Sequence, residues 1–325
     1  MKMKRRALLA AAIALAVSAP AAQAQDAYPS RPVRLVVPFP AAGPLDLLAR
    51  IVSQGLGEQW GQPVIVENKA GAAGGIGADA VAKAAPDGYT LLVTVEIPLT
   101  MRPAVTREMS YDPRADFAPI AGLTRSDNAL FVHPSVGVDT VQALIAKAKA
   151  EPGKLTFSSA GYGAPAHFGG ELFKTETGVN MTHVPYKGAA PAMNALLAGE
   201  VSAFFGPVPQ GLPHVRSGRI KALALAGTRA SPLMPEVRPF PELGYPSIIV
   251  STWFGALAPK GTPAPALDKV RESLARVMAD PGVRDRLGKV GMDIEWMDGP
   301  ELGRAIDAGM KRWAEVAKKA GVKAN

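Results

Sequence analysis

The stretches of this sequence with the clearest chemical potential are two loops of small residues. Residues 39–46 and 158–167 consist mainly of Gly, Ala, Ser and Pro, and each loop runs into a helix that is opened by proline. A loop of this kind leaves backbone N–H groups without acceptors, and a helix N-terminus carries a partial positive charge. The pattern predicts two sites for a carboxylate or phosphate, with ordinary tight connections as the open alternative.

Several side chains in or near these loops have two possible roles. Asp46 stands near the third helical position, where we expect it to lock the loop rather than contact a ligand. Ser158 and Ser159 either hydrogen-bond an oxyanion or cap the helix, and Tyr162 is expected to line a cleft. Glu96 follows a strand end, where an unpaired buried carboxylate is costly. We therefore favour a solvated Glu96 over one reserved for a donor group on the ligand.

Catalytic arrangements are weak in this sequence. Ser158 and His167 lack the Gly-x-Ser-x-Gly context of a serine hydrolase. Gly75, Gly77 and Ala80 imitate a dinucleotide fingerprint, but the loop before them is long. We expect no catalysis and no cofactor.

Metal binding is equally weak. His167 and Glu171 lie four residues apart on a predicted helix and could hold a metal, but His133, His183 and His214 show no ligand spacing. A capped or exposed His167 is the better interpretation, and we expect no metal.

A repeated unit of apolar strand, small-residue loop and helix positions these loops. It occurs in residues 33–95 and again in residues 155–226, which predicts parallel sheets covered on both faces. Residues 117–132 and 248–258 look like two crossings between lobes, and the helices after them, which have no sheet of their own, should pack back on the first lobe. The spacing predicts a first lobe from residues 25–125 and 251–325, a second lobe from residues 126–250, and a hinge between them.

The N-terminus predicts export. Lys2, Lys4, Arg5 and Arg6 precede an apolar stretch, and Ala22-Gln23-Ala24 is a cleavage pattern, so residues 1–24 read as a signal peptide. The chain has no cysteine, which removes disulfides, thiol catalysis and cysteine metal sites. Without the four leader charges, 32 positive residues face 28 negative ones, and they are scattered. No nucleic-acid partner is expected.

The sequence resembles the Bug family, the periplasmic binding components of tripartite tricarboxylate transporters, over almost all of the predicted mature chain. The motifs that carry the resemblance are Val37-Pro38-Phe39-Pro40, Val66-Glu67-Asn68-Lys69-Ala70-Gly71-Ala72, Pro86-Asp87-Gly88-Tyr89, Pro152-Gly153-Lys154-Leu155, Ser159-Ala160-Gly161, Gly170-Glu171-Leu172-Phe173, His183-Val184-Pro185-Tyr186-Lys187-Gly188, Trp253-Phe254-Gly255 and Ala258-Pro259-Lys260-Gly261.

This resemblance implies an α/β fold of the two-lobed type II periplasmic-binding-protein class (a Venus flytrap) with two hinge crossings. It also implies a cleft in which the two loops grip one carboxylate. The expected ligand-binding residues are Phe39, Pro40, Ala41, Ala42, Gly43, Leu45, Asp46, Glu96, Ser158, Ser159, Ala160, Gly161, Tyr162, Gly163, His167, Tyr186, Gly188 and Gly206.

Three departures from the family pattern bear on the ligand. The first loop has Ala42-Gly43 in place of Gly-Gly, Leu45 replaces a threonine, and Gly206 replaces an aspartate that many members carry. The changes make the pocket less polar and remove a possible anchor for an ammonium group. We therefore expect a carboxylate without an amino group, with an aromatic or long aliphatic body.

The sequence thus predicts a monomeric periplasmic solute-binding protein that delivers a di- or tricarboxylate or an aromatic acid to the membrane subunits of a tripartite tricarboxylate-type transporter. A periplasmic receptor that feeds a signalling system is the alternative, because both roles use the same lobe closure. A secreted hydrolase is the third candidate.

Overall fold

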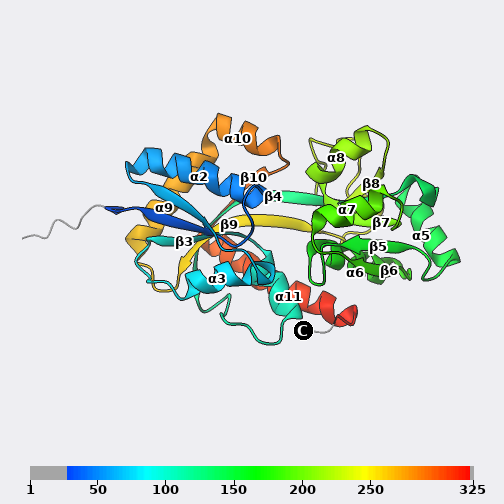
Figure 1. Ribbon diagram of the computed structural model, residues 1–325, viewed down its shortest axis with the longest axis horizontal. Helices are drawn as coiled ribbons and strands as arrows, with labels where there is room; N and C mark the ends of the chain where they lie inside the picture. The colour runs from blue at the N-terminus through cyan, green and yellow to red at the C-terminus, as the bar shows by residue number, and fades with distance from the viewer. Residues whose placement is uncertain (1–27, 323–325) are drawn as a thin grey trace, which may run out of the picture.

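The computed structural model describes residues 28–322 as two lobes joined by long strands (Figure 1). The predicted signal peptide, residues 1–24, lies outside the described residues. Within the described part, no helix is both long enough and apolar enough to cross a membrane.

The sheet of the first lobe has the strand order β2-β1-β3-β9-β4-β10. Its first three strands are parallel, whereas β9 is antiparallel to both β3 and β4. The elements of this lobe are β1 (Val33–Val37), α2 (Pro44–Trp60), β2 (Val64–Asn68), α3 (Gly75–Ala82), β3 (Thr90–Val95), α4 (Arg102–Val105), α9 (Ala264–Ala279), α10 (Pro281–Gly288), β10 (Asp293–Asp298) and α11 (Gly299–Lys319). Figure 1 shows α2, α9 and α10 on one face of the sheet and α3 and α11 on the other.

The sheet of the second lobe runs β6-β5-β7-β4, with β8 also paired to β4. Strand β5 is parallel to both of its neighbours, as the strand-loop-helix pattern predicted. The elements are α5 (Val141–Ala150), β5 (Thr156–Ser159), α6 (Pro165–Thr177), β6 (Thr182–Pro185), α7 (Ala189–Leu197), β7 (Ala203–Pro207), α8 (Val208–Arg216) and β8 (Lys221–Leu225).

Two strands connect the lobes. Strand β4 (Phe117–Val132) pairs with β9 (Ser251–Pro259) as far as Asp127, and from Asn128 onward it pairs with β7 and β8 in the other sheet. The two predicted crossings are confirmed, and with them the two-lobed α/β fold. The lobe boundaries at residues 125/126 and 250/251 remain a prediction, and the switch of partners in β4 lies two residues later, between Asp127 and Asn128.

The hydrophobic patterns that predicted the elements correspond to buried faces. Leu48, Ile51, Val52 and Leu56 form the buried stripe of α2, and every residue of β3 is buried. Helix α2 begins at a proline and ends at Gly61, whose left-handed conformation at φ 63° terminates it. Burial of this stripe fixes the helix so that its N-terminus and the loop before it lie at the carboxyl end of β1.

The C-terminal region departs from the expectation of helices without a sheet. Strand β10 lies between α10 and α11 and pairs antiparallel with β4 at the edge of the first-lobe sheet. Its residues are only partly buried, so its hydrophobic signal in the sequence is weak.

Helix α11 contacts both lobes. Leu302 and Ile306 pack in a first-lobe core, whereas Trp313, Val316 and Ala317 pack in the core of the second lobe. The expectation that the C-terminal helices pack only on the first lobe is therefore wrong for the second half of α11. This helix is a third connection between the lobes.

Gly77, part of the apparent dinucleotide fingerprint, has a packing role. A Cβ at this position would lie 2.7 Å from Pro38 Cα and 2.9 Å from the Lys69 carbonyl oxygen, both of which are backbone atoms. We predict that Gly77→Ala lowers the free energy of unfolding by about 2 kcal/mol, because backbone must move to admit the methyl group. Gly288→Ala, in α10, has nothing within 4 Å of the added carbon and serves as the control. Chemical denaturation of both variants checks this, and equal stabilities would contradict it.

Candidate ligand-binding site

The first-lobe loop is held by Asp46, which lies in the first turn of α2. This buried carboxylate accepts hydrogen bonds from Ala42 N–H at 3.0 Å, Arg50 Nε at 2.8 Å and Asn68 Nδ2 at 3.0 Å. Asn68 also donates to the carbonyl of Phe39 at 3.1 Å. The hydrogen bond from Arg50, with those from Ala42 and Asn68, holds the pKa of Asp46 below its ordinary value against the opposing effect of burial. Asp46 thus locks the loop, the role that its position predicted.

The locked loop leaves donors without acceptors. Among the described residues, no hydrogen bond uses the N–H groups of Ala41, Gly43, Leu45 or Asp46. Ala42 is held in the left-handed region at φ 65°, a conformation that costs a residue with a Cβ roughly 1–2 kcal/mol. The Leu45 side chain packs in the first-lobe core, so only its backbone can reach a ligand. The loop therefore offers backbone donors at a helix N-terminus.

The second-lobe loop is also fixed by side chains that accept hydrogen bonds from its backbone. Ser159 Oγ accepts the N–H of Gly161 at 3.1 Å, and His167 Nδ1 accepts the N–H of Gly163 at 3.1 Å. The N–H groups of Ala160, Tyr162 and Ala166 have no acceptor among the described residues. The two loops thus share one plan, in which some N–H groups fix the loop and others remain available.

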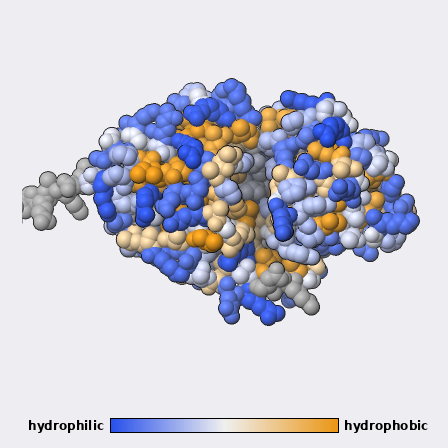
Figure 2. Space-filling view, viewed as in Figure 1, coloured by the Kyte–Doolittle hydropathy of each residue, from blue (hydrophilic) through white to orange (hydrophobic). Residues whose placement is uncertain are grey.

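The segment from Ile97 to Val105, absent from our predicted site, lies against both loops. In the first lobe, the Phe39 ring and Pro98 both flank Gly74, where an added Cβ would approach them to 3.0–3.2 Å. In the second lobe, a Cβ on Gly163 would lie 2.7 Å from Val105. Ile97 packs against the cores of both lobes. Figure 2 shows the surface hollowed between the lobes.

The expectation of a solvated Glu96 is wrong. Glu96 is 4% exposed, and its Oε2 lies 3.3 Å from Thr100 Oγ1 and 3.4 Å from Trp313 Nε1. Its Oε1 has no hydrogen-bond partner among the described atoms. Burial raises the pKa of Glu96 to about 7, and the hydrogen bond from Trp313 and the charge of Arg312 oppose the shift. Trp313 in turn packs on Phe168 of α6, with the two ring centres 5.0 Å apart. Glu96 therefore lies at the junction of the two lobes.

Other predicted residues are spread over the second lobe. Ser158 is buried and donates to the Ala192 carbonyl, so its hydroxyl is already used. Tyr162 is 64% exposed, and Gly188 is the N-cap of α7 with Tyr186 before it on the same loop. Gly206 is buried, and a Cβ there would lie 2.3 Å from the Phe204 ring. Phe204 therefore occupies the space in which a side chain at position 206 would begin.

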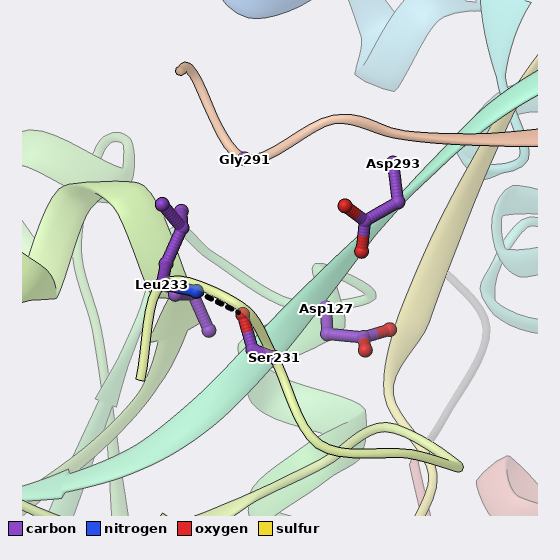
Figure 3. A pocket seen from close by; sticks show the side chains of 6 residues that line it. Asp127, Ser231, Leu233, Gly291 and Asp293 are labelled. Carbon is purple, nitrogen blue, oxygen red and sulfur yellow. Dashed lines mark hydrogen bonds between the residues drawn. The ribbon is translucent and has the colours of Figure 1, made fainter. Parts of the chain in front are cut away.

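Figure 3 shows a small cavity beside the crossing, lined in part by Asp127, Ser231 and Asp293. Arg125 forms ion pairs near this cavity: its Nε lies 3.2 Å from the Asp127 carboxylate, and its Nη1 lies 3.1 Å from the Glu295 carboxylate of β10. The carboxylates of Asp127 and Asp293 border the cavity and Arg125 pairs with only the first of them, so the cavity disfavours an anion. Within residues 28–322, no group of three or more His, Cys, Asp and Glu side chains could hold a metal ion.

The two lobes are joined by crossing strands, and each carries a loop that is fixed by hydrogen bonds while some of its N–H groups have no acceptor. These features are those of a two-lobed solute-binding protein. Residues 48–322 match the family described as "Tripartite tricarboxylate transporter family receptor", and the chain belongs to this family. Proteins of this family are periplasmic substrate-binding receptors and not enzymes.

Relatives and solved structures agree with this assignment. "Protein BugT" of Bordetella pertussis (strain Tohama I) is 36% identical over 299 residues, which cover 92% of each chain. The structure "R. palustris Rpa4515 with adipate" is 34% identical with a TM-score of 0.81, covering 92% of this chain and 100% of that one. "MatC (Rpa3494) from Rhodopseudomonas palustris with bound malate" is 30% identical with a TM-score of 0.76, covering 89% and 99%.

The role of Asp46 can be tested by substitution. We predict that Asp46→Ala lowers the free energy of unfolding by about 2–3 kcal/mol, because the Ala42 N–H and the Asn68 amide lose their buried acceptor. The contribution of Asp46 is present above its unfolded pKa and is lost as pH falls through its lower folded pKa. Asp285→Ala, which removes an exposed carboxylate four residues from Lys289, is the matched control. Urea titrations at pH 7 and pH 3 measure both, and similar losses in the two variants at pH 7 would refute the lock.

The burial of Glu96 predicts a distinct pH dependence. The pKa of Glu96 rises from its ordinary 4.5 to about 7 on folding, so its contribution to stability is present below pH 4.5 and is lost as pH rises through 7. Glu96→Gln should therefore unfold at a higher temperature than the wild type at pH 8, by the equivalent of about 2–3 kcal/mol. The difference should shrink at pH 5. Glu176→Gln, at an exposed position of α6, is the control. An equal effect of Glu96→Gln at both pH values would show that Glu96 ionises normally.

Proposed function

We propose that this protein captures a small organic carboxylate in the periplasm and delivers it to the membrane subunits of a tripartite tricarboxylate-type transporter. The observation that carries the proposal is the pair of locked loops, whose free N–H groups lie at the N-termini of α2 and α6. Aligned N–H donors at a helix N-terminus stabilise a negative charge. The stretches 39–43 and 160–164 contain no Lys or Arg, so backbone donors perform this task.

The chemistry of the two loops favours a carboxylate as the bound group. A carboxylate has two oxygens that can accept several hydrogen bonds, so donors from both lobes can share it. Sharing one group between the lobes favours the closed arrangement, since only that arrangement supplies both sets of donors. Closure then presents the surface that the membrane subunits recognise.

Two observations support an acid without an amino group. The neighbours described with adipate and malate hold dicarboxylates that carry no ammonium group. At position 206, where many family members have an aspartate, the Phe204 ring fills the space that a side chain would need. A buried ammonium group would then lack a charged partner, which is costly. We infer a di- or tricarboxylate or an aromatic acid, with an apolar body against this part of the second lobe.

Export and assembly complete the proposal. The leader in residues 1–24 would direct the chain to the periplasm, and we expect the mature protein to act as a monomer that meets its transporter in the closed state. The proposal needs no cofactor and no metal.

A thermal-shift panel tests the proposed ligand class. We expect adipate, malate, citrate or terephthalate, at a hundredfold excess over its dissociation constant, to stabilise the protein by about 3 kcal/mol and raise its Tm by several degrees. Adipamide, which matches adipate in size but has no charge, should give no shift. Aspartate and glutamate should shift the Tm less than the best simple acid. A larger shift with aspartate would refute the preference, and no shift with any acid would refute carboxylate capture.

A further inference from the structure

Two stacked imidazoles lie directly beneath the second-lobe loop. His183 of β6 and His167 of α6 stack with ring centres 4.2 Å apart and planes 19° apart. Phe157 of β5 stacks on His183 with ring centres 4.9 Å apart, and the exposed Tyr162 ring lies beside the stack, perpendicular to both imidazoles, with its centre 5.3 Å from that of His167 and 5.2 Å from that of His183. The pair therefore fills the space between the second-lobe sheet and the loop.

Each imidazole holds one point of the loop. His167 Nδ1 accepts the N–H of Gly163, and His183 Nε2 lies 2.6 Å from Ser159 Oγ, which itself accepts the N–H of Gly161. Gly161 and Gly163 have positive φ angles of 120° and 76°. The N–H groups of Gly161 and Gly163 therefore point toward the imidazoles. The N–H groups of the adjacent residues Ala160 and Tyr162 have no acceptor among the described residues.

The hydrogen bond to Gly163 requires a neutral imidazole at His167. An acceptor at His167 Nδ1 has no proton there, and a protonated ring would direct a second donor at the Gly163 N–H. Burial, with the charge of Lys174, lowers the pKa of His167 to about 4. Burial, His167 and Lys174 lower the pKa of His183 to about 3. Lys174, which is paired with Glu171 on α6 at 3.0 Å, is the charge that acts on both rings.

We propose that His183, together with His167, is a positioning residue for carboxylate binding, and that both imidazoles act as neutral supports of the loop rather than as cations that contact the ligand. The inference rests on the proposed function. His183 matters because its bond to Ser159 and its stacking on His167 keep the Ala160 and Tyr162 N–H groups turned to the cleft.

Affinity measurements with substitutions test the support. Isothermal titration calorimetry with adipate should show roughly tenfold weaker binding for each of two variants. His183→Phe keeps an aromatic ring but loses the hydrogen bond to Ser159, and His167→Leu leaves the Gly163 N–H without an acceptor. His167→Asn supplies an amide oxygen to that N–H and should recover most of the affinity. His214→Phe, on α8 and outside the loop, should bind adipate as the wild type does. Wild-type affinity in both His183→Phe and His167→Leu would overturn the proposal.

The pH profile separates a neutral support from a cationic contact. In the Glu96→Gln variant, which removes the buried carboxyl group that titrates near pH 7, the affinity for adipate should stay constant from pH 8 to pH 6, because neither imidazole gains a proton in this range and adipate stays largely doubly ionised. Affinity that rises in this variant as pH falls through 6.5 would show an imidazolium at the carboxylate and would overturn the proposal.

A measurement without ligand keeps the inference testable if no acid binds. Nitrogen-15 NMR of the imidazoles should show His167 and His183 neutral down to pH 5, with the proton of His167 on Nε2. Titration of either ring near pH 6.5, or a proton on His167 Nδ1, would refute the support role. Failure of adipate and every other acid to bind, with the neutral rings present, would instead refute the proposed function alone.

Discussion

An anion that is bound by backbone N–H groups needs those groups to be fixed before it arrives, and the rest of the site serves this constraint. In the first lobe, Asp46 takes the Ala42 N–H and Asn68 holds the Phe39 carbonyl. In the second lobe, Ser159 and His167 take the N–H groups of Gly161 and Gly163. Fixing donors in advance reduces the entropy that is lost on binding. It also explains why so many polar side chains of the site are already engaged within the protein.

In the proposed function, closure about the hinge brings the two loops together around one ligand. Strands β4 and β9 pass between the sheets, and α11 adds a third connection, because its first half packs on one lobe and Trp313 on the other. Glu96 lies where these parts meet, buried beside Trp313 and Thr100. A ligand shifts the equilibrium between open and closed lobes only by its difference in affinity for the two states. In the proposed function, donors on both lobes provide that difference, since the closed state alone would bring them to one carboxylate.

Local patterns in the sequence predicted what local physics determines. The strand-loop-helix repeats, the two crossings and the locking role of Asp46, four residues from Ala42, were all readable because the residues concerned are neighbours in sequence. The burial of Glu96 and the contact of His183 escaped the sequence for the opposite reason, because their partners lie far away along the chain. Glu96 is buried by Trp313, which lies 217 residues away, and His183 meets Ser159 across 24 residues. The partly buried β10 gave too weak a pattern, and the Leu45 side chain turned into the core while its N–H stayed at the loop.

The most direct test of the account is to observe the backbone amides of both loops in one complex. In nitrogen-15 TROSY spectra titrated with the acid that gives the largest thermal shift, the amide protons of Gly43 and Leu45 and those of Ala160 and Tyr162 should move downfield together. Such shifts would show that one carboxylate accepts hydrogen bonds from both lobes. Shifts confined to one loop, or found at Arg and Lys side chains instead of these amides, would contradict the claim that fixed backbone donors of two lobes grip the ligand.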